Sequence, residues 1–236
     1  MTPQIPRWVT VVAGIALTLC LVLANALLSV RASATNLRLY QDLWVELDVM
    51  ADTGMSLEDL TKAGKALIDY LVGKTTDSPQ LTTTIDGQER PLYSQKELRH
   101  LEDVRALFQT GFTAEWLSTA AAFAIAVLLI TSGEHKAASI ALYAAALISI
   151  TALVILALPA ASDFTGWWTK FHLLTFTNDL WLLDPQTDWL IRMFPEPFFF
   201  AMVKRAGIHA AVTALVLALA GFVIGLIGRK RRRTVA

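Results

Sequence analysis

Four long blocks of apolar residues, separated by ordinary polar sequence, dominate the pattern of the chain. They run from about residue 8 to 30, 112 to 130, 137 to 158 and 208 to 227. Each has roughly the 20 apolar residues that an α-helix needs to cross the ~30 Å hydrocarbon core of a bilayer. The pattern therefore predicts an all-α polytopic membrane protein with four transmembrane helices, which forms a single membrane domain over residues 1–236.

The first block is too long for a secretory signal peptide, although Ala32-Ser33-Ala34 offers a small-x-small cleavage site. The apolar core of a signal peptide has ~7–15 residues, and a single basic residue, Arg7, precedes this block. We therefore interpret the block as the first span. Cys20, the one cysteine of the chain, lies inside it, so no intrachain disulfide can form. We interpret Cys20 as a small buried apolar side chain.

The distribution of charge predicts the orientation in the membrane. The formal net charge is zero and 17% of residues are charged, but a run of Arg and Lys follows the fourth block at 229–233. Because cytoplasmic flanks of membrane helices are rich in Lys and Arg, we expect the basic tail 228–236 in the cytoplasm. Four crossings then place the N-terminus there as well and leave residues 31–111 and 159–207 extracellular. A basic run directly after an apolar helix indicates a membrane anchor, so we expect no nucleic acid as a partner.

The first extracellular segment predicts a mostly helical cap. Residues 34–50 favour a helix that continues or restarts after the first span. Capping boxes begin at Ser56 and at Ser94, and the second of them predicts a helix over about 95–109. Between the two boxes, residues 75–92 are rich in Thr and contain an Asp-Gly turn signal, which predicts a loop or a short hairpin.

The second extracellular segment is too polar to cross a bilayer and too aromatic for a free loop. Residues 164–200 contain four of the seven tryptophans together with many phenylalanines. Trp favours the headgroup region of a membrane, and Phe can lie just beneath it. We therefore expect short interfacial amphipathic helices here.

Two histidines in the extracellular segments are the candidates for chemistry. His100 lies in R-H-L-E-D-V-R, and Glu97 and Asp103 lie one turn from it on the same helical face. His172 lies in the aromatic segment. An acidic neighbour can orient a histidine ring and raise its basicity. The two histidines and Asp103 also offer three ligands to a metal ion, but no zinc-binding motif accompanies them, so we expect no metal and no cofactor.

Two stretches resemble the lipoprotein intramolecular transacylases (Lit), a family of bacterial integral membrane proteins. They are R-H-L-E-D-V-R at 99–105 and F-H-L-L-T-F-T-N-D-L-W-L-L-D-P-Q-T-D-W-L-I-R-M-F-P-E-P-F-F at 171–199. The arrangement of four spans and two outer segments is also similar. The two family histidines correspond to His100 and His172.

This resemblance implies an acyltransferase of the bacterial cytoplasmic membrane, whose substrate is a lipoprotein with a diacylglyceryl group on its N-terminal cysteine. The enzyme would move the sn-2 acyl chain onto the α-amino group of that cysteine. The product would be the lyso-form lipoprotein, which is N-acylated and carries a monoacylglyceryl group on sulfur. Membrane lipids are the other expected partners, and we expect a monomer.

Such an ester aminolysis needs a base and hydrogen-bond donors for the tetrahedral oxyanion. Because the amine and the ester belong to the same modified cysteine, the substrate itself supplies most of the proximity. Histidine, with a pKa of about 6.5, suits the base. We take His100 as the first choice for the base and His172 as the general acid or oxyanion donor, and the reverse assignment stays open.

The remaining candidate residues would support the two histidines. Glu97 or Asp103 is expected to orient His100, and Arg105 to hold the oxyanion or the peptide backbone. Four aromatic residues are expected to bind the acyl chains: Trp168, Phe171, Phe176 and Trp181. A direct transfer is favoured over a covalent intermediate, because Cys20 lies within a span and no serine occurs in a nucleophile-elbow motif.

A non-enzymatic membrane protein is the alternative hypothesis, either a chaperone that binds lipids or lipoproteins or a sensor. The first extracellular segment, about 80 residues long, has room for a ligand. A transporter fits less well, since the spans hold few ionisable residues.

Overall fold

The computed structural model describes residues 5–85 and 87–235, and their backbone divides into two compact units. One, the span unit, comprises the chain up to Val30, Phe112–Leu158 and the chain from Gly207 onward. The other, the polar unit, comprises Arg31–Gly111 and Pro159–Ala206.

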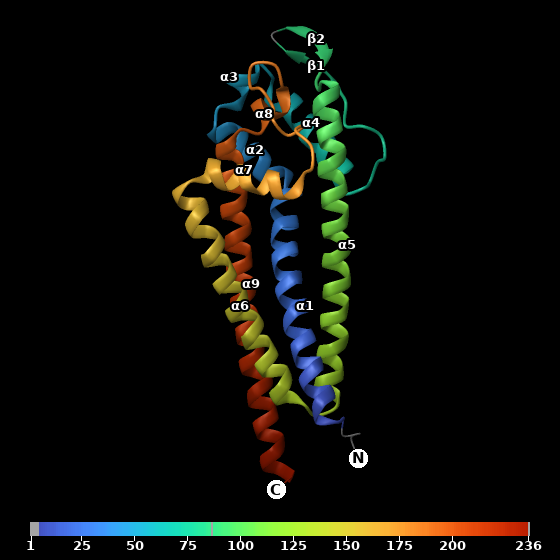
Figure 1. Ribbon diagram of the computed structural model, residues 1–236, viewed down its shortest axis with the longest axis vertical. Helices are drawn as coiled ribbons and strands as arrows, with labels where there is room; N and C mark the ends of the chain where they lie inside the picture. Colours follow the sequence, from blue (N-terminus) through green and yellow to red (C-terminus); the bar gives the residue numbers. More distant parts are fainter. Residues whose placement is uncertain (1–4, 86, 236) are drawn as a thin grey trace. The chain divides into compact units, whose positions relative to one another are not determined.

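Four helices contain the apolar blocks: α1 (Arg7–Ala34), α5 (Gln95–Thr131), α6 (His135–Ser162) and α9 (Glu196–Val235) (Figure 1). All four contain a stretch long and apolar enough to cross a membrane. The helix expected at 95–109 and the second apolar block are parts of the one helix α5. The break between them is absent because Gly111 costs only ~1 kcal/mol inside a helix.

Side chains that hydrogen-bond to backbone carbonyls join the helices of the span unit. Asn25 Nδ2 on α1 donates to the Ala210 carbonyl on α9 over 3.2 Å, and Ser139 Oγ on α6 donates to the Gly221 carbonyl over 2.8 Å. A Cβ atom at Gly221 would lie 3.2 Å from the Ser139 carbonyl oxygen. Small residues therefore allow the close helix approach that is common in membrane bundles.

Short helices and one hairpin make up the rest of the polar unit (Figure 1): α2 (Leu37–Glu46), α3 (Val49–Thr53), α4 (Leu57–Leu71), β1 (Thr82–Ile85), β2 (Gln88–Pro91), α7 (Phe164–Thr175) and α8 (Trp189–Met193). The two strands are antiparallel, with Thr82 opposite Pro91. Of the loop and the hairpin that remained open for residues 75–92, the structure has the hairpin. Asp86 lies outside the described residues.

The helix expected over residues 34–50 is broken twice. Asn36 caps α2, because its Oδ1 accepts a hydrogen bond from the Leu39 amide over 3.1 Å. Asp48 has a positive φ of 52° and separates α2 from α3. Asn and Asp favour such positions because their short side chains hydrogen-bond nearby backbone and tolerate the left-handed region.

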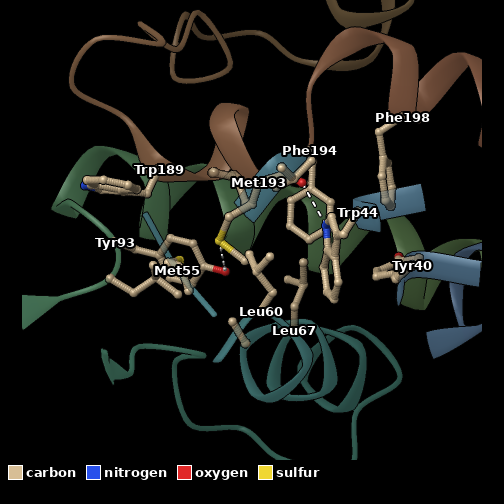
Figure 2. Packing of buried hydrophobic residues seen from close by; sticks show 14 of the residues in the cluster. Tyr40, Trp44, Met55, Leu60, Leu67, Tyr93, Trp189, Met193, Phe194 and Phe198 are labelled. Carbon is tan, nitrogen blue, oxygen red and sulfur yellow. Dashed lines mark hydrogen bonds between the residues drawn. The ribbon is translucent and has the colours of Figure 1, made fainter. Parts of the chain in front are cut away.

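A buried aromatic core holds the polar unit together. The fully buried Trp44 donates from Nε1 to the Met193 carbonyl over 2.9 Å, which ties α2 to α8 (Figure 2). The ring of Tyr40 makes edge contacts with Trp44, Phe194 and Phe198 at centroid distances of 5.2–5.8 Å. Aromatic pairs in this geometry contribute about 0.5–1.5 kcal/mol each beyond their burial.

Gly64 on α4 lies against this core, so Gly64→Ala tests its packing. The added Cβ would lie 2.5 Å from Cη2 of Trp44, a side chain with no exposed surface into which it could move. We expect Gly64→Ala to lower the free energy of unfolding by about 1–3 kcal/mol through overpacking. The measurement is thermal unfolding in detergent, followed by circular dichroism.

Gly14→Ala on α1 is the matched control, since no described atom outside its chain neighbours and the backbone of its own helix lies within 4 Å of the added Cβ. It should leave the midpoint unchanged or raise it slightly, because Ala favours a helix over Gly. Equal midpoints for Gly64→Ala and the wild type would contradict a rigid core around Trp44.

Candidate active site

The two candidate histidines lie close together in the polar unit. His100 is on the polar first turns of α5, His172 is on α7, and their ring centroids are 6.4 Å apart. Both side chains are buried, with residue exposures of 7% and 8%. The fold thus brings together two histidines that are far apart in the sequence.

Aromatic rings surround His172. We call Trp168, Phe171, Phe176 and Trp181 the aromatic cluster. The ring of Trp168 meets His172 edge-on at 4.7 Å, and Trp181 stacks on it at 4.8 Å. Phe176 lies 5.7 Å from His172 and 5.3 Å from His100, so it contacts both rings. All four residues expected to bind acyl chains therefore lie next to the histidines, since Phe171 is 5.3 Å from His172.

A hydrogen bond to the Trp168 carbonyl determines which ring nitrogen of His172 carries the hydrogen. Its Nδ1 lies 2.8 Å from the carbonyl oxygen of Trp168, one turn earlier on α7. A carbonyl oxygen can only accept, so Nδ1 must carry the hydrogen. In the neutral ring, Nε2 then holds the lone pair and is the basic nitrogen.

In His100, unlike in His172, Nδ1 has no hydrogen bond to a described residue. Its Nδ1 is buried and has no hydrogen-bond partner in the described part of the chain. Buried polar groups in proteins are nearly always hydrogen-bonded, and exceptions are frequent at functional sites. The Nδ1 atom of His100 therefore has a hydrogen-bonding capacity that the described residues do not use.

Burial keeps both rings neutral. Burial is the main reason that the pKa of His100 is lowered to about 4; electrostatic interactions with His172 and Lys96 act in the same direction, and the carboxylate of Asp103 opposes the shift. Burial also lowers the pKa of His172, against the hydrogen bond to Trp168, which raises it. At pH 7 the site thus contains two uncharged imidazoles, and His172 presents an unprotonated Nε2.

Glu97 does not contact His100 through a hydrogen bond. Its side chain is fully buried, and its Oε2 accepts from the Ser94 amide over 2.7 Å, as expected for a capping box. Its Oε1 accepts from the Leu190 amide over 2.6 Å. One carboxylate therefore serves the N-terminus of α5 and the first turn of α8.

Asp103 and Arg105 also have partners other than the histidines. Asp103 Oδ2 accepts a hydrogen bond from Asn178 Nδ2 over 2.9 Å. The Arg105 guanidinium lies over the ring of Tyr70, 4.4 Å from its centroid. Among the described residues, no hydrogen bond joins either side chain to His100 or His172.

Asn178 is a residue of the site region that the sequence analysis missed. It follows α7, and its Oδ1 accepts from the Leu180 amide over 3.0 Å, which forms an Asx turn. The Asn178-Asp179 pair after the apolar residues of α7 signals such a turn. It does not reveal the partner on α5.

The geometry suits proton transfer by neutral imidazoles in an apolar setting. One ring presents a lone pair, the other has a free ring nitrogen, and aromatic side chains flank both. No group of three His, Cys, Asp or Glu side chains within residues 5–85 and 87–235 could hold a metal ion.

Comparison with known proteins assigns the family. A family model described as lipoprotein intramolecular transacylase Lit matches residues 15–199. The chain belongs to the Lit family. Lit proteins are acyltransferases, so the chain is an enzyme of this class, and the resemblance of the two sequence stretches is confirmed.

Solved Lit structures share the fold of this chain. Membrane-integral Lit from Bacillus cereus matches with a TM-score of 0.81 at 20% identity, over 97% of this chain and 100% of the other. A variant of it with one histidine replaced by arginine matches with a TM-score of 0.79 at 19% identity, over 97% and 96%. The predicted all-α polytopic membrane class is confirmed by this match to the Lit fold. Among curated proteins, no sequence matches the chain.

The buried His100 makes the folded state sensitive to acid. In the unfolded chain its pKa is about 6.5, and in the folded state it is about 4. Between these pH values the unfolded state binds more protons, so stability falls as the pH falls. The slope from one such group approaches ~1.4 kcal/mol per pH unit.

We therefore expect the unfolding midpoint in detergent to decrease from pH 6.5 to pH 4. His100→Gln should decrease less steeply, because it removes this titration. Thermal unfolding of both proteins across that range is the measurement. Identical pH dependence of the two midpoints would contradict a neutral buried His100.

Proposed function

We propose that this chain moves the sn-2 acyl chain of a diacylglyceryl-modified lipoprotein onto the α-amino group of its N-terminal cysteine. The product is the lyso-form lipoprotein, N-acylated and with monoacylglyceryl on sulfur. The observation that carries the proposal is the pair of buried, neutral histidines beside the aromatic cluster, in a chain of the transacylase family.

The basic nitrogen of His172 makes it the preferred base. The α-amine nitrogen attacks the ester carbonyl carbon, and Nε2 of His172 takes the proton that the amine loses. Collapse of the tetrahedral intermediate breaks the bond between the acyl carbon and the sn-2 oxygen, which receives that proton. An amide forms, a hydroxyl is left on the glyceryl group, and the enzyme returns to its starting state.

His100 then stabilises the oxyanion. A neutral imidazole can donate a hydrogen bond to a developing negative charge, and its low pKa keeps it neutral. The unpartnered Nδ1 of His100 supports this role, because a bound substrate would satisfy it. This assignment reverses the first choice made from the sequence, for the reason that the Trp168 carbonyl fixes the tautomer of His172.

The substrate brings the reacting groups together by itself. Amine and ester are parts of one modified cysteine, and well-oriented intramolecular reactions reach effective molarities on the order of 10⁵ M or more. An ester is exchanged for an amide, which requires neither ATP nor a cofactor. A site with two histidines and an apolar surround is therefore sufficient.

The proposed orientation in the membrane rests on the distribution of basic residues along the chain. We place both termini in the cytoplasm because of the basic run at 229–233, and the polar unit on the extracellular face. On α7, Leu173 and Leu174 are 63% and 89% exposed, which suits contact with lipid at the interface. The aromatic cluster beside them would bind the acyl chains of a substrate that arrives from the bilayer.

The direct test uses purified protein in detergent and a diacylglyceryl lipopeptide with a free α-amine. Intramolecular transfer conserves mass, so tandem mass spectrometry must locate the acyl chain. We expect fragments with an amide-linked acyl chain on cysteine and monoacylglyceryl on sulfur. An unchanged fragmentation pattern would contradict the transferase and favour a protein that only binds lipoproteins.

Substitution of the histidines separates their roles. His172→Gln should reduce the rate to background, because an amide is not a base. His100→Gln retains a hydrogen-bond donor, so it should keep measurable activity; loss of the donor in His100→Ala should cost about 10²–10³-fold in kcat.

His209→Gln, in the span unit, is the control and should keep the wild-type rate. Initial rates of lyso-form production measure all four variants. Equal loss in His100→Gln and His172→Gln would contradict the division into base and oxyanion donor.

A further inference from the structure

Hydrogen bonds between α5 and the segment after α7 bear on the spacing of His100 and His172. No hydrogen bond between the two rings is present in the described residues, and they lie on different helices. The segment that follows α7, residues 176–190, is instead hydrogen-bonded to the first turns of α5. The position of this segment on α5 therefore influences the position of His172 at the end of α7.

Three side chains of α5 hold this segment. Lys96 Nζ donates to the Leu182 carbonyl and lies 3.6 Å from the Asp188 carboxylate. Glu97 accepts from the Leu190 amide. The third contact joins Asp103 to Asn178 and is the nearest in sequence to both histidines, three residues after His100 and six after His172.

Both polar atoms of the Asn178 side-chain amide make hydrogen bonds. Its Oδ1 accepts from the Leu180 amide over 3.0 Å, and its Nδ2 donates to Asp103 over 2.9 Å. The backbone N–H of Leu180 can only donate and the ionised Asp103 can only accept, so the orientation of the amide is determined. The bond to the carboxylate is charge-assisted and stronger than a neutral one.

We infer that Asn178 and Asp103 are positioning residues for the acyl transfer, and that their hydrogen bond sets the approach of His172 to His100. This inference rests on the proposed transacylase function and names residues that act on it without touching the reacting atoms. A displacement of about 1 Å in a catalytic group can reduce a rate on the order of 10²-fold, so such a bond has a measurable effect on turnover.

Asp103 has a second possible role that must be separated from this one. Its negative charge acts on the His100 ring and opposes the lowering of its pKa by burial. If charge alone mattered, Asn178 would be dispensable. If the hydrogen bond matters, the donor and the acceptor can exchange places without loss.

Exchanging the two side chains is feasible because an Asp at 178 can still accept the hydrogen bond from the Leu180 amide. In the double variant D103N/N178D, Asn at 103 can donate to Asp at 178, and the second oxygen of that Asp still accepts from the Leu180 amide. All the hydrogen bonds are retained while the charge moves to the other segment. In N178D alone, two carboxylates face each other. In D103N alone, Asn178 can still donate to the amide oxygen at 103.

The test is kcat and KM for lyso-form production by four proteins: wild type, N178D, D103N and D103N/N178D. We expect N178D to lose about 10–100-fold in kcat with KM little changed, and D103N to lose less. D103N/N178D should recover to within about threefold of wild type, because it restores a charge-assisted bond. The controls are Asp179→Asn and Glu102→Gln, exposed neighbours of the pair.

A charge-only role gives a different pattern. D103N would then be the slow single variant, and N178D, which keeps Asp103, would keep the wild-type kcat; a wild-type kcat in N178D overturns the inference. If N178D does not fold, Asn178→Ala decides instead: it removes the donor and leaves the charge of Asp103 in place, so a wild-type kcat in that variant overturns the inference. Wild-type turnover in the same assay tests the transacylase function separately, so an active wild type with an equally active N178D rejects only the positioning role.

Discussion

Burial of two imidazoles among aromatic rings is the constraint on which the rest of the site depends. A charged imidazolium is poorly solvated in such surroundings, so both rings rest in the neutral form. A neutral imidazole can take a proton in the transition state, and it can also donate a hydrogen bond. The same burial leaves Nδ1 of His100 without a partner in the described chain, which lowers stability and leaves a hydrogen-bonding capacity that the proposed oxyanion role would use.

Such a site requires a rigid frame, because neither histidine is held by the other. The frame is the aromatic core of the polar unit, in which Trp44 bonds to the Met193 carbonyl and fixes α8 (Figure 2). Glu97 links α8 to the first turn of α5 through the Leu190 amide. The chain between α7 and α8 is thus anchored at its far end by buried contacts.

The proposed reaction explains why a site with two histidines and aromatic side chains would be sufficient. In the proposed reaction the amine and the ester are tethered in the substrate, so the enzyme would have to supply only proton transfer and charge stabilisation. The other requirement of the proposed reaction is to bind lipid chains, for which apolar and aromatic side chains are suited. At 20% identity to Bacillus cereus Lit, the chain keeps the same fold over 97% of its length. The fold can therefore be retained while most of the sequence changes.

The sequence by itself determined what depends on local or periodic patterns. The four apolar blocks lie in four long helices, the capping box at Ser94 forms with its Glu97 partner, and the two family stretches identify the enzyme class. It also pointed to His100 and His172, because few polar residues of the outer segments suit base catalysis. The continuity of α5 through Gly111 was not predictable, since a glycine permits either a break or a helix.

Only the tertiary structure decided which side chains meet. Glu97 and Asp103 share a helical face with His100, which suggested that they orient it, yet they bond to Leu190 and Asn178. Those partners are 93 and 75 residues away in the chain, and no spacing rule connects them. The tautomer of His172, on which the proposed choice of base rests, likewise follows from the geometry of one ring against the Trp168 carbonyl. Local patterns specify helices and caps, whereas pairings across the fold depend on how those helices pack.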